Sequence, residues 1–160
     1  MNRRSLWIFI LIAIVLGITL WSVGGDRALS MAPYYWHRLR DETGVVQIGD
    51  DRVLVEIART SQTQQTGLSH RNYLPYEKGM LFTFTVAGQY IFTMRDTKIP
   101  LDIIWINEGA IVHIEHRAQP GVELINPQVI ATDVLEITSG GAAARGWKIG
   151  DTVSITFDRD

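Results

Sequence analysis

The sequence predicts an α+β fold: one N-terminal transmembrane helix, then a β-rich domain built as a curled antiparallel sheet or partial barrel with two short helices. Three observations support this prediction. A long apolar run opens the 160-residue chain. Short apolar or alternating segments then follow one another, separated by Gly, Asn and Asp turn signals, which is typical of antiparallel strands. Helix-like patterns occur only in two brief stretches, so strands should dominate the domain.

Residues 1–25 have the features of a signal-anchor. Arg3 and Arg4 precede an almost wholly apolar run, residues 6–23, which as a helix would span the roughly 30 Å hydrocarbon core of a bilayer. Arginines at this end should stay in the cytoplasm and direct the rest of the chain across the membrane. A cleaved signal peptide is the alternative, but its apolar region is usually only about 7–15 residues long. We therefore expect a single-pass protein of the cytoplasmic membrane with its N-terminus inside, secreted if the signal is cleaved.

Residues 26–43 are expected to form a juxtamembrane linker. Pro33 discourages a continuous helix through this stretch. The aromatic residues 34–36 have two open interpretations: they rest at the outer headgroup layer, or they pack beneath the following domain. The linker would thus join the membrane to the extracytoplasmic (periplasmic or outer) side.

Residues 44–160 should form one globular domain. The chain is 46% hydrophobic and 20% charged, a composition that supports a packed core. Its formal net charge is -2 and it lacks a basic stripe, which argues against a nucleic-acid partner. The absence of cysteine excludes disulfides, thiolate metal sites and thiol nucleophiles.

The first elements of the domain are a hairpin and a helix. Residues 45–48 and 52–58 alternate on either side of a Gly-Asp-Asp turn signal, which predicts two antiparallel strands. Thr60 or Ser61 can then cap a short polar helix over residues 62–69. This helix has few apolar residues, so packing must hold it in place.

The later elements are predicted to be strands around one more helical segment. Residues 81–86 and 90–94, separated by Ala-Gly, predict a second hairpin. The continuous apolar run 103–106 predicts a strand buried on both faces. A returning strand over residues 110–116, strands over 134–138 and 152–157, and a glycine-flanked helical segment over 139–147 complete the domain.

The domain resembles the DUF192 family of small secreted or membrane-anchored prokaryotic proteins. The resemblance covers roughly residues 45–157 and is carried by an ordered set of short motifs. These motifs are Val55-Glu56-Ile57-Ala58, Gly67-Leu68-x-x-Arg71, Gly79-Met80-Leu81-Phe82, Met94-x-x-Thr97, Ile99-Pro100-Leu101-Asp102, Val134-Leu135-Glu136 and Gly150-Asp151.

The resemblance implies a compact β-rich domain with short helices behind a signal sequence. It implies no catalytic residues, because the family has no assigned function. The sequence departs from the usual family pattern at Ser69, Thr93 and Asp96, where methionine, tryptophan and asparagine are typical.

Several residues within these motifs are candidates for a ligand-binding set. One interpretation is a cleft in which arginine binds an anionic or hydroxylated ligand and carboxylates orient it. The other is a structural network, in which Asp102 caps a turn and Arg71 pairs with Asp96 or Glu136. If the segment after Met94 is a strand, Arg95 and Thr97 face one side and Asp96 the other. The candidates are Arg71, Met94, Arg95, Asp96, Thr97, Asp102 and Glu136.

We predict a membrane-tethered extracytoplasmic domain that binds a small or polymeric envelope ligand or a protein partner. The alternative is an envelope carbohydrate hydrolase whose paired carboxylates come from Asp96, Asp102 and Glu136. Whether the protein is an enzyme stays open at this point. Neither a cofactor nor a metal is predicted, because His113 and His116, three apart on a strand, should face opposite sides.

Overall fold

The computed structural model describes residues 42–158. The predicted transmembrane segment and most of the predicted linker lie outside the described residues. Within residues 42–158, no helix is long and apolar enough to cross a membrane. In chain order the elements are β1 (Thr43–Ile48), β2 (Asp51–Ala58), α2 (Ser61–Thr66), β3 (Lys78–Gly88), β4 (Leu101–Asn107), β5 (Ala110–Ala118), β6 (Ala131–Thr138), α3 (Gly141–Arg145) and β7 (Val153–Phe157).

The strands form one curled sheet in the order β5-β4-β6-β3-β2-β1-β7. Neighbouring strands are antiparallel except for β2 and β3, which run parallel. The two edges approach each other where Ala110 bridges Thr152 and the amide of Val153 donates to the carbonyl of Gly109 over 2.7 Å. The predicted β-rich, curled sheet with two short helices is therefore confirmed, although one strand pair is parallel.

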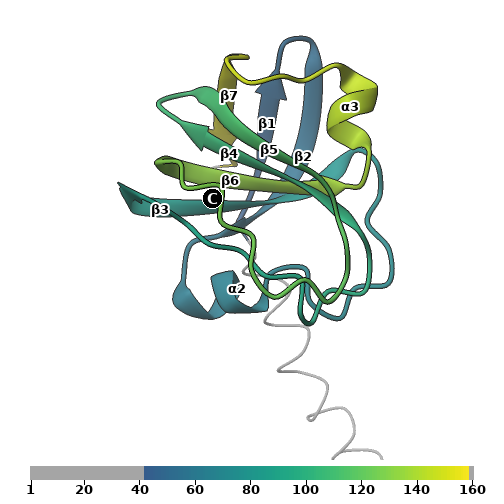
Figure 1. Cartoon of the computed structure of the whole chain (residues 1–160). Helices are drawn as coiled ribbons and strands as arrows, with labels where there is room; N and C mark the ends of the chain where they lie inside the picture. The colour runs from purple at the N-terminus through teal and green to yellow at the C-terminus, as the bar shows by residue number, and fades with distance from the viewer. Residues whose placement is uncertain (1–41, 159–160) are drawn as a thin grey trace, which may run out of the picture. The chain divides into compact units, whose positions relative to one another are not determined.

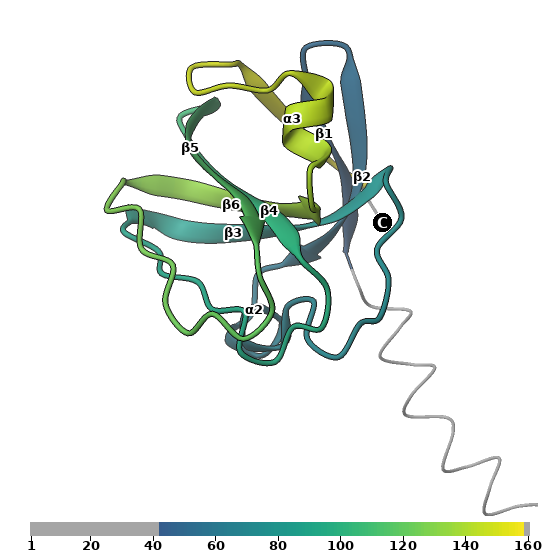
Figure 2. The same ribbon diagram turned by 45° about the vertical axis from the view of Figure 1, so that its right-hand side comes forward.

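Curling gives the sheet an inner and an outer face (Figure 1). Each face has its own hydrophobic core. The inner core draws residues from all seven strands, and Ala142 and Trp147 of the α3 region pack into it. The outer core is built from strands β2 to β6 together with the long connections. Figures 1 and 2 show α3 and α2 on opposite sides of β3 and β6, with the long connections on the α2 side.

Local sequence signals explain the first elements. Gly49 adopts φ 59° in the β1–β2 turn, a left-handed conformation that suits glycine. Thr60 caps α2 and exchanges hydrogen bonds with Thr63 in a capping box. The helix ends at Thr66 rather than at the predicted residue 69, because Gly67 leaves helical geometry at φ 48° and ψ -138°.

The predicted hairpin between residues 81–86 and 90–94 is wrong. β3 extends from Lys78 to Gly88, and residues 90–94 form no strand beyond one bridge, from Phe92 to Ile125. β3 pairs instead with β2 through Lys78–Phe82 and with β6 through Gly79–Thr83 and Gly88. Residues 90–94 do not pair with β3 but cross the outer face, because Tyr90 and Phe92 pack against the outer core and Phe92 bridges Ile125.

The central strand β4 has the buried character that its apolar run predicts. Residues 101–106 are all buried, because β5 and β6 flank the strand and both cores cover it. Irregular register between β4 and β5 accompanies the curl at this edge. The returning strand β5, the strand β6, the short helix α3 and the closing strand β7 all occur where the sequence predicts them.

Candidate functional site

A cleft of about 490 Å³ lies on the outer face of the sheet, beside α2. One side comes from α2 and the turn after it, and the other from β3 and the segment after β3. Glu136 of β6 contributes a carboxyl group. The lining residues are Ser61, Gln64, Gln65, Thr66, Gly67, Leu68, Ser69, Phe82, Phe84, Tyr90, Ile91, Phe92, Thr93, Asp96, Thr97 and Glu136.

Specific hydrogen bonds fix α2 at the edge of the cleft. The side-chain amide of Gln64 donates to the carbonyl of Ala58 over 3.3 Å and to that of Thr83 over 3.1 Å. The amide of His70 donates to the carbonyl of Asp96 over 3.2 Å, which ties the end of the helical turn to the opposite segment. Because α2 buries none of its residues, these bonds, and not an apolar face, position it.

Aromatic side chains form the second wall. Phe84 and Tyr90 are stacked, with ring centroids 3.4 Å apart and planes within 9°. Phe82 meets Phe92 edge to face at 5.0 Å, and Phe92 meets Trp105 at 5.6 Å. The indole N–H of Trp105 donates to the carbonyl of Tyr90 over 2.9 Å, so the buried strand β4 supports this aromatic wall from below.

Glu136 is the buried acidic residue of the cleft lining. Its side chain is only 5% exposed, and its register partners are Met80 of β3 and Ile103 of β4, both buried and apolar. Within residues 42–158, its carboxyl group makes no hydrogen bond. Burial raises the pKa of Glu136 from 4.5 to about 8, against the opposing pull of the positive charge on Arg71. The carboxyl group is therefore mostly protonated and neutral at pH 7.

Arg71 lies near Glu136 but binds a different carboxylate. Its guanidinium donates to both oxygens of Glu56, one bond measuring 2.7 Å. Arg71 thus forms an ion pair with Glu56, and its charge also acts on Glu136, one of the two partners predicted. In the sheet register Glu56, Met80 and Glu136 are successive neighbours across β2, β3 and β6. The two glutamates consequently share the outer face on either side of Met80. Arg71 binds Glu56, and its positive charge lowers the pKa of Glu136.

The predicted residues after β3 separate into different environments. Residues 94–97 form a turn, in which the amide of Thr97 donates to the carbonyl of Met94 over 3.2 Å, so the strand alternation assumed for them does not apply. Asp96 and Thr97 both line the cleft. Met94 is fully buried in the outer core, and Arg95 is exposed, its guanidinium 3.9 Å from Glu123. Asp96 and Thr97 are therefore the two that join Glu136.

Asp102 has no part in the cleft, because it projects from the inner face of the sheet. Its carboxylate accepts hydrogen bonds from the amides of Arg117 (2.8 Å), Gly140 (3.0 Å) and Ala142 (2.9 Å). The side chain is completely buried. Asp102 thus caps the start of α3 and joins it to β4, as the structural interpretation of this residue predicted.

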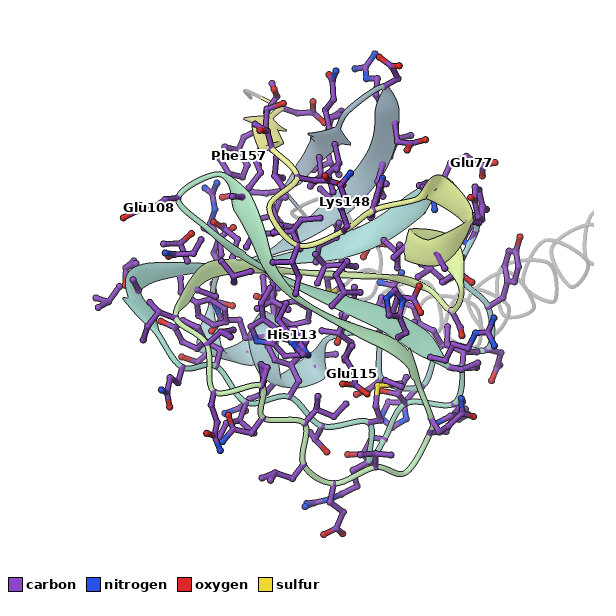
Figure 3. The ribbon with its side chains drawn as sticks, turned by 45° about the horizontal axis from the view of Figure 1, so that its top comes forward. Glu77, Glu108, His113, Glu115, Lys148 and Phe157 are labelled. Carbon is purple, nitrogen blue, oxygen red and sulfur yellow. The ribbon has the colours of Figure 1, made fainter. Side chains whose placement is uncertain are left out.

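The histidines of β5 diverge as predicted. His113 packs its ring against Trp105 on the outer face at 5.5 Å, with Glu115 at 3.8 Å; Figure 3 labels both residues on this strand. His116 lies 3.9 Å from Asp102, which belongs to the inner face. Across residues 42–158, no group of three or more His, Asp or Glu side chains is arranged to hold a metal ion.

Sequence reasoning missed most of the cleft. Gln64 and Gln65 of α2 and the pair Phe84 and Tyr90 were not among the candidates, although they form its walls. Two signals were available: a glutamine-rich helix without an apolar face, and aromatic residues clustered around Ala87-Gly88. Neither one indicates that the two segments meet.

The architecture defines the class: a small domain built on a curled, mostly antiparallel sheet, with a cleft on its outer face. The chain belongs to the DUF192 family, because the model of that family, described as an uncharacterized ACR, matches residues 44–155. Ser69, Thr93 and Asp96, at which the sequence departs from the family pattern, all line the cleft. The departures are thus concentrated at one place in the fold.

Two solved structures share this fold. A protein of unknown function from Novosphingobium aromaticivorans DSM 12444 is 36% identical, with a TM-score of 0.64 over 70% of this chain and 83% of its own. A candidate transcription regulator from Sinorhizobium meliloti 1021 is 27% identical, with a TM-score of 0.66 over 71% of this chain and 92% of its own. No functionally curated protein matches the chain significantly.

Proposed function

We propose that this protein is a membrane-tethered extracytoplasmic domain that binds a small or polymeric envelope ligand in the cleft beside α2. The apolar run of residues 6–23 after Arg3 and Arg4 supports the tether and the orientation. The cleft supports the binding. A protein partner is the less favoured ligand, because the cleft is concave and its size suits a small molecule or one unit of a polymer.

The single observation that carries the binding proposal is Glu136 lining a cleft of about 490 Å³. Ligand pockets commonly occupy roughly 300–1,000 Å³ and combine apolar walls with a few convergent polar groups. A carboxyl group only 5% exposed, with no hydrogen bond within residues 42–158, costs free energy in the unliganded fold. A ligand that hydrogen-bonds this group would recover that cost on binding.

Blocking the cleft tests the binding proposal. The full chain, reconstituted in lipid nanodiscs, would be screened by thermal shift against peptidoglycan fragments, oligosaccharides, nucleotides and metal ions. Ser69→Trp places an indole in the cleft, whereas Asn72→Trp places the same group on an exposed position outside it. We expect a hit whose stabilisation is lost in Ser69→Trp and kept in Asn72→Trp. Equal responses in the two variants would contradict binding in the cleft.

A topology experiment tests the tether. A reporter that is active only outside the cytoplasm would be fused after residue 160, and the protein's size would be compared before and after export. We expect an active reporter on a full-length, membrane-bound chain. Replacing Arg3 and Arg4 by glutamates should reduce correct insertion. An inactive reporter, or a soluble fusion, would contradict the proposed tether.

A hydrolase is the second candidate function, and one observation favours it. Glu136 and Asp96 line the same cleft, and Glu136 keeps its proton at neutral pH because burial raises its pKa to about 8. A protonated acid beside a second carboxylate is the pair that glycoside hydrolysis uses. Asp102 cannot belong to this pair, because it lies on the other face of the sheet.

Release of reducing ends from envelope glycans discriminates between the two functions. A hydrolase would release them, and Glu136→Gln would lower the rate on the order of a hundredfold or more. Asp96→Asn should lower the rate as well if the two carboxylates act as a pair. A wild-type chain that binds a glycan without cleaving it would leave only the binding function.

A further inference from the structure

The two walls of the cleft differ in chemistry. One consists of aromatic and aliphatic groups from β3 and the segment that follows it, with the rigid Phe84–Tyr90 stack and the 54%-exposed Ile91. The other offers hydroxyl and amide groups from α2 and the turn after it. Its polar members are Ser61, Gln64, Gln65, Thr66 and Ser69.

No lysine, arginine or histidine lines the cleft within the described residues 42–158. The guanidinium of Arg71, whose charge acts on Glu136, is bound to both oxygens of Glu56. The exposed carboxylate of Asp96 contributes negative charge to the rim. A phosphate or carboxylate ligand would therefore enter against a like charge and find no cation in the lining.

Glu136 adds a buried carboxyl group to the lining. Its side chain is only 5% exposed, and its neighbours Met80 and Ile103 give it no polar partner. In its neutral form the carboxyl group can donate one hydrogen bond and accept others. Such a group pairs with a hydroxyl or a carbonyl of an uncharged ligand without burying a net charge.

We infer that the ligand of this cleft is an uncharged, hydroxylated ring: a sugar unit of a neutral glycan, bound between the aromatic wall and the amide wall. A pyranose ring has one face of C–H groups, which are slightly positive and pack against the negative face of an aromatic ring. Its rim carries hydroxyl groups that pair with glutamine amides and with Glu136. This inference rests on the proposed binding function and names its ligand class.

Saturation-transfer difference NMR tests the ligand class with the full chain in lipid nanodiscs. The probes are chitotriose as a neutral glycan, trigalacturonate as its anionic counterpart and AMP as a phosphate. We expect saturation transfer to chitotriose, strongest at the C–H protons of one ring face, and none to the other two probes. Empty nanodiscs provide the control for binding to lipid.

Two variants of α2 provide a matched comparison. Gln65→Ala removes an amide that lines the cleft, whereas Gln62→Ala removes the same group from an exposed position outside the lining. Neither glutamine side chain takes part in a hydrogen bond within residues 42–158, so both variants should fold. We expect Gln65→Ala to weaken chitotriose binding about fivefold to tenfold and Gln62→Ala to leave it unchanged.

The outcomes separate this inference from the function on which it rests. Cleft-dependent binding of trigalacturonate or AMP, with no neutral sugar bound, would overturn the ligand class but leave a binding domain. Chitotriose binding that is equally strong in both glutamine variants and in Ser69→Trp would overturn the cleft as the sugar site. If no probe of either panel bound, both the ligand class and the proposed function would be overturned.

Discussion

Asp102 and Glu136 lie in adjacent strands, one register position apart, yet their side chains project from opposite faces of the sheet. Asp102 pairs with Ile137 and Glu136 with Ile103 in the β4–β6 ladder. Asp102 binds three backbone amides near α3, whereas Glu136 faces the outer cleft without a hydrogen-bond partner within residues 42–158. Two buried acids so close in the fold therefore have separate roles, and each role makes a different prediction.

Asp102→Asn should destabilise the domain without changing the cleft. An amide in place of the carboxylate points an NH2 group at one of the backbone donors of Arg117, Gly140 and Ala142, so we expect a loss of about 2–4 kcal/mol in the free energy of unfolding. Asp96→Asn, the same change at an exposed carboxylate, should alter stability by about 0.5 kcal/mol or less. Thermal unfolding of both variants measures the difference, and a cleft ligand should still bind Asp102→Asn.

Glu136 should make the stability of the fold fall as pH rises. Its pKa is about 8 in the folded protein against 4.5 for a glutamate exposed to solvent, so the folded state binds the proton more tightly than the unfolded state. This contribution is complete below pH 4.5 and is lost progressively up to pH 8. Across that window it amounts to a loss on the order of a few kcal/mol.

Glu136→Gln removes this titration while keeping the shape of the side chain. Unfolding transitions of the wild type and of Glu136→Gln, followed from pH 4 to pH 9, should diverge with increasing pH, with the variant the more stable at the alkaline end. The difference between the two proteins isolates Glu136 from its charged neighbours Arg71, Glu56 and Asp96. If the stability of the wild type and of Glu136→Gln changed with pH in parallel, the buried, protonated state of Glu136 would be contradicted.

Arg71 and Glu56 should shift the pKa of Glu136 in opposite directions. Arg71→Gln removes the positive charge that lowers it, so the pKa should rise above about 8. Glu56→Gln removes a negative charge from the same face and releases the guanidinium that it binds, so the pKa should fall. Carbon-13 NMR of the glutamate carboxyl groups measures both shifts. If the pKa of Glu136 moved in the same direction in both variants, the placement of Glu56 and Glu136 on either side of Met80 would be contradicted.

Gly79→Ala should destabilise the sheet at the point where β3 crosses β6. A Cβ atom at this position would lie 2.6 Å from the carbonyl oxygen of Glu136, and backbone cannot yield as a flexible side chain can. We expect a loss of about 2–3 kcal/mol in the free energy of unfolding. Gly88→Ala in the same strand is the matched control, because its Cβ would meet only the ring of Tyr90 at 3.5 Å. Equal melting temperatures of Gly79→Ala and Gly88→Ala would contradict the close approach of the backbone at Gly79 to the carbonyl oxygen of Glu136.

Much of the fold follows from short-range signals. The β1–β2 hairpin, the capped helix α2, the buried strand β4 and the helical turn of α3 each occur where local patterns place them. The hairpin prediction failed because residues 90–94, despite their strand-like composition, pack on the outer core and make a single bridge, from Phe92 to Ile125. Parallel pairing of β2 with β3 also escaped prediction, because it depends on a connection that local patterns do not describe.

The cleft was predictable only in part. Asp96, Thr97 and Glu136 were among the candidates and line it, while Met94, Arg95 and Asp102 lie elsewhere. Sequence position could not separate these groups, because the turn after Met94 and the two faces of the sheet decide where each side chain projects. Arg71 illustrates the same limit, since it binds Glu56, which was not among the acids expected as its partners.

The sequence by itself determined the apolar N-terminal run, the β-rich class of the domain, its family and the places of most strands, because these depend on periodicity, composition and motif order along the chain. Only the tertiary structure decided that Glu136 is buried at a cleft, that Asp102 caps α3, and that Gln64 and Gln65 line the same cleft as the stack of Phe84 and Tyr90. The physical reason is that burial, pKa and wall chemistry arise from segments far apart in sequence, which meet only when the sheet curls.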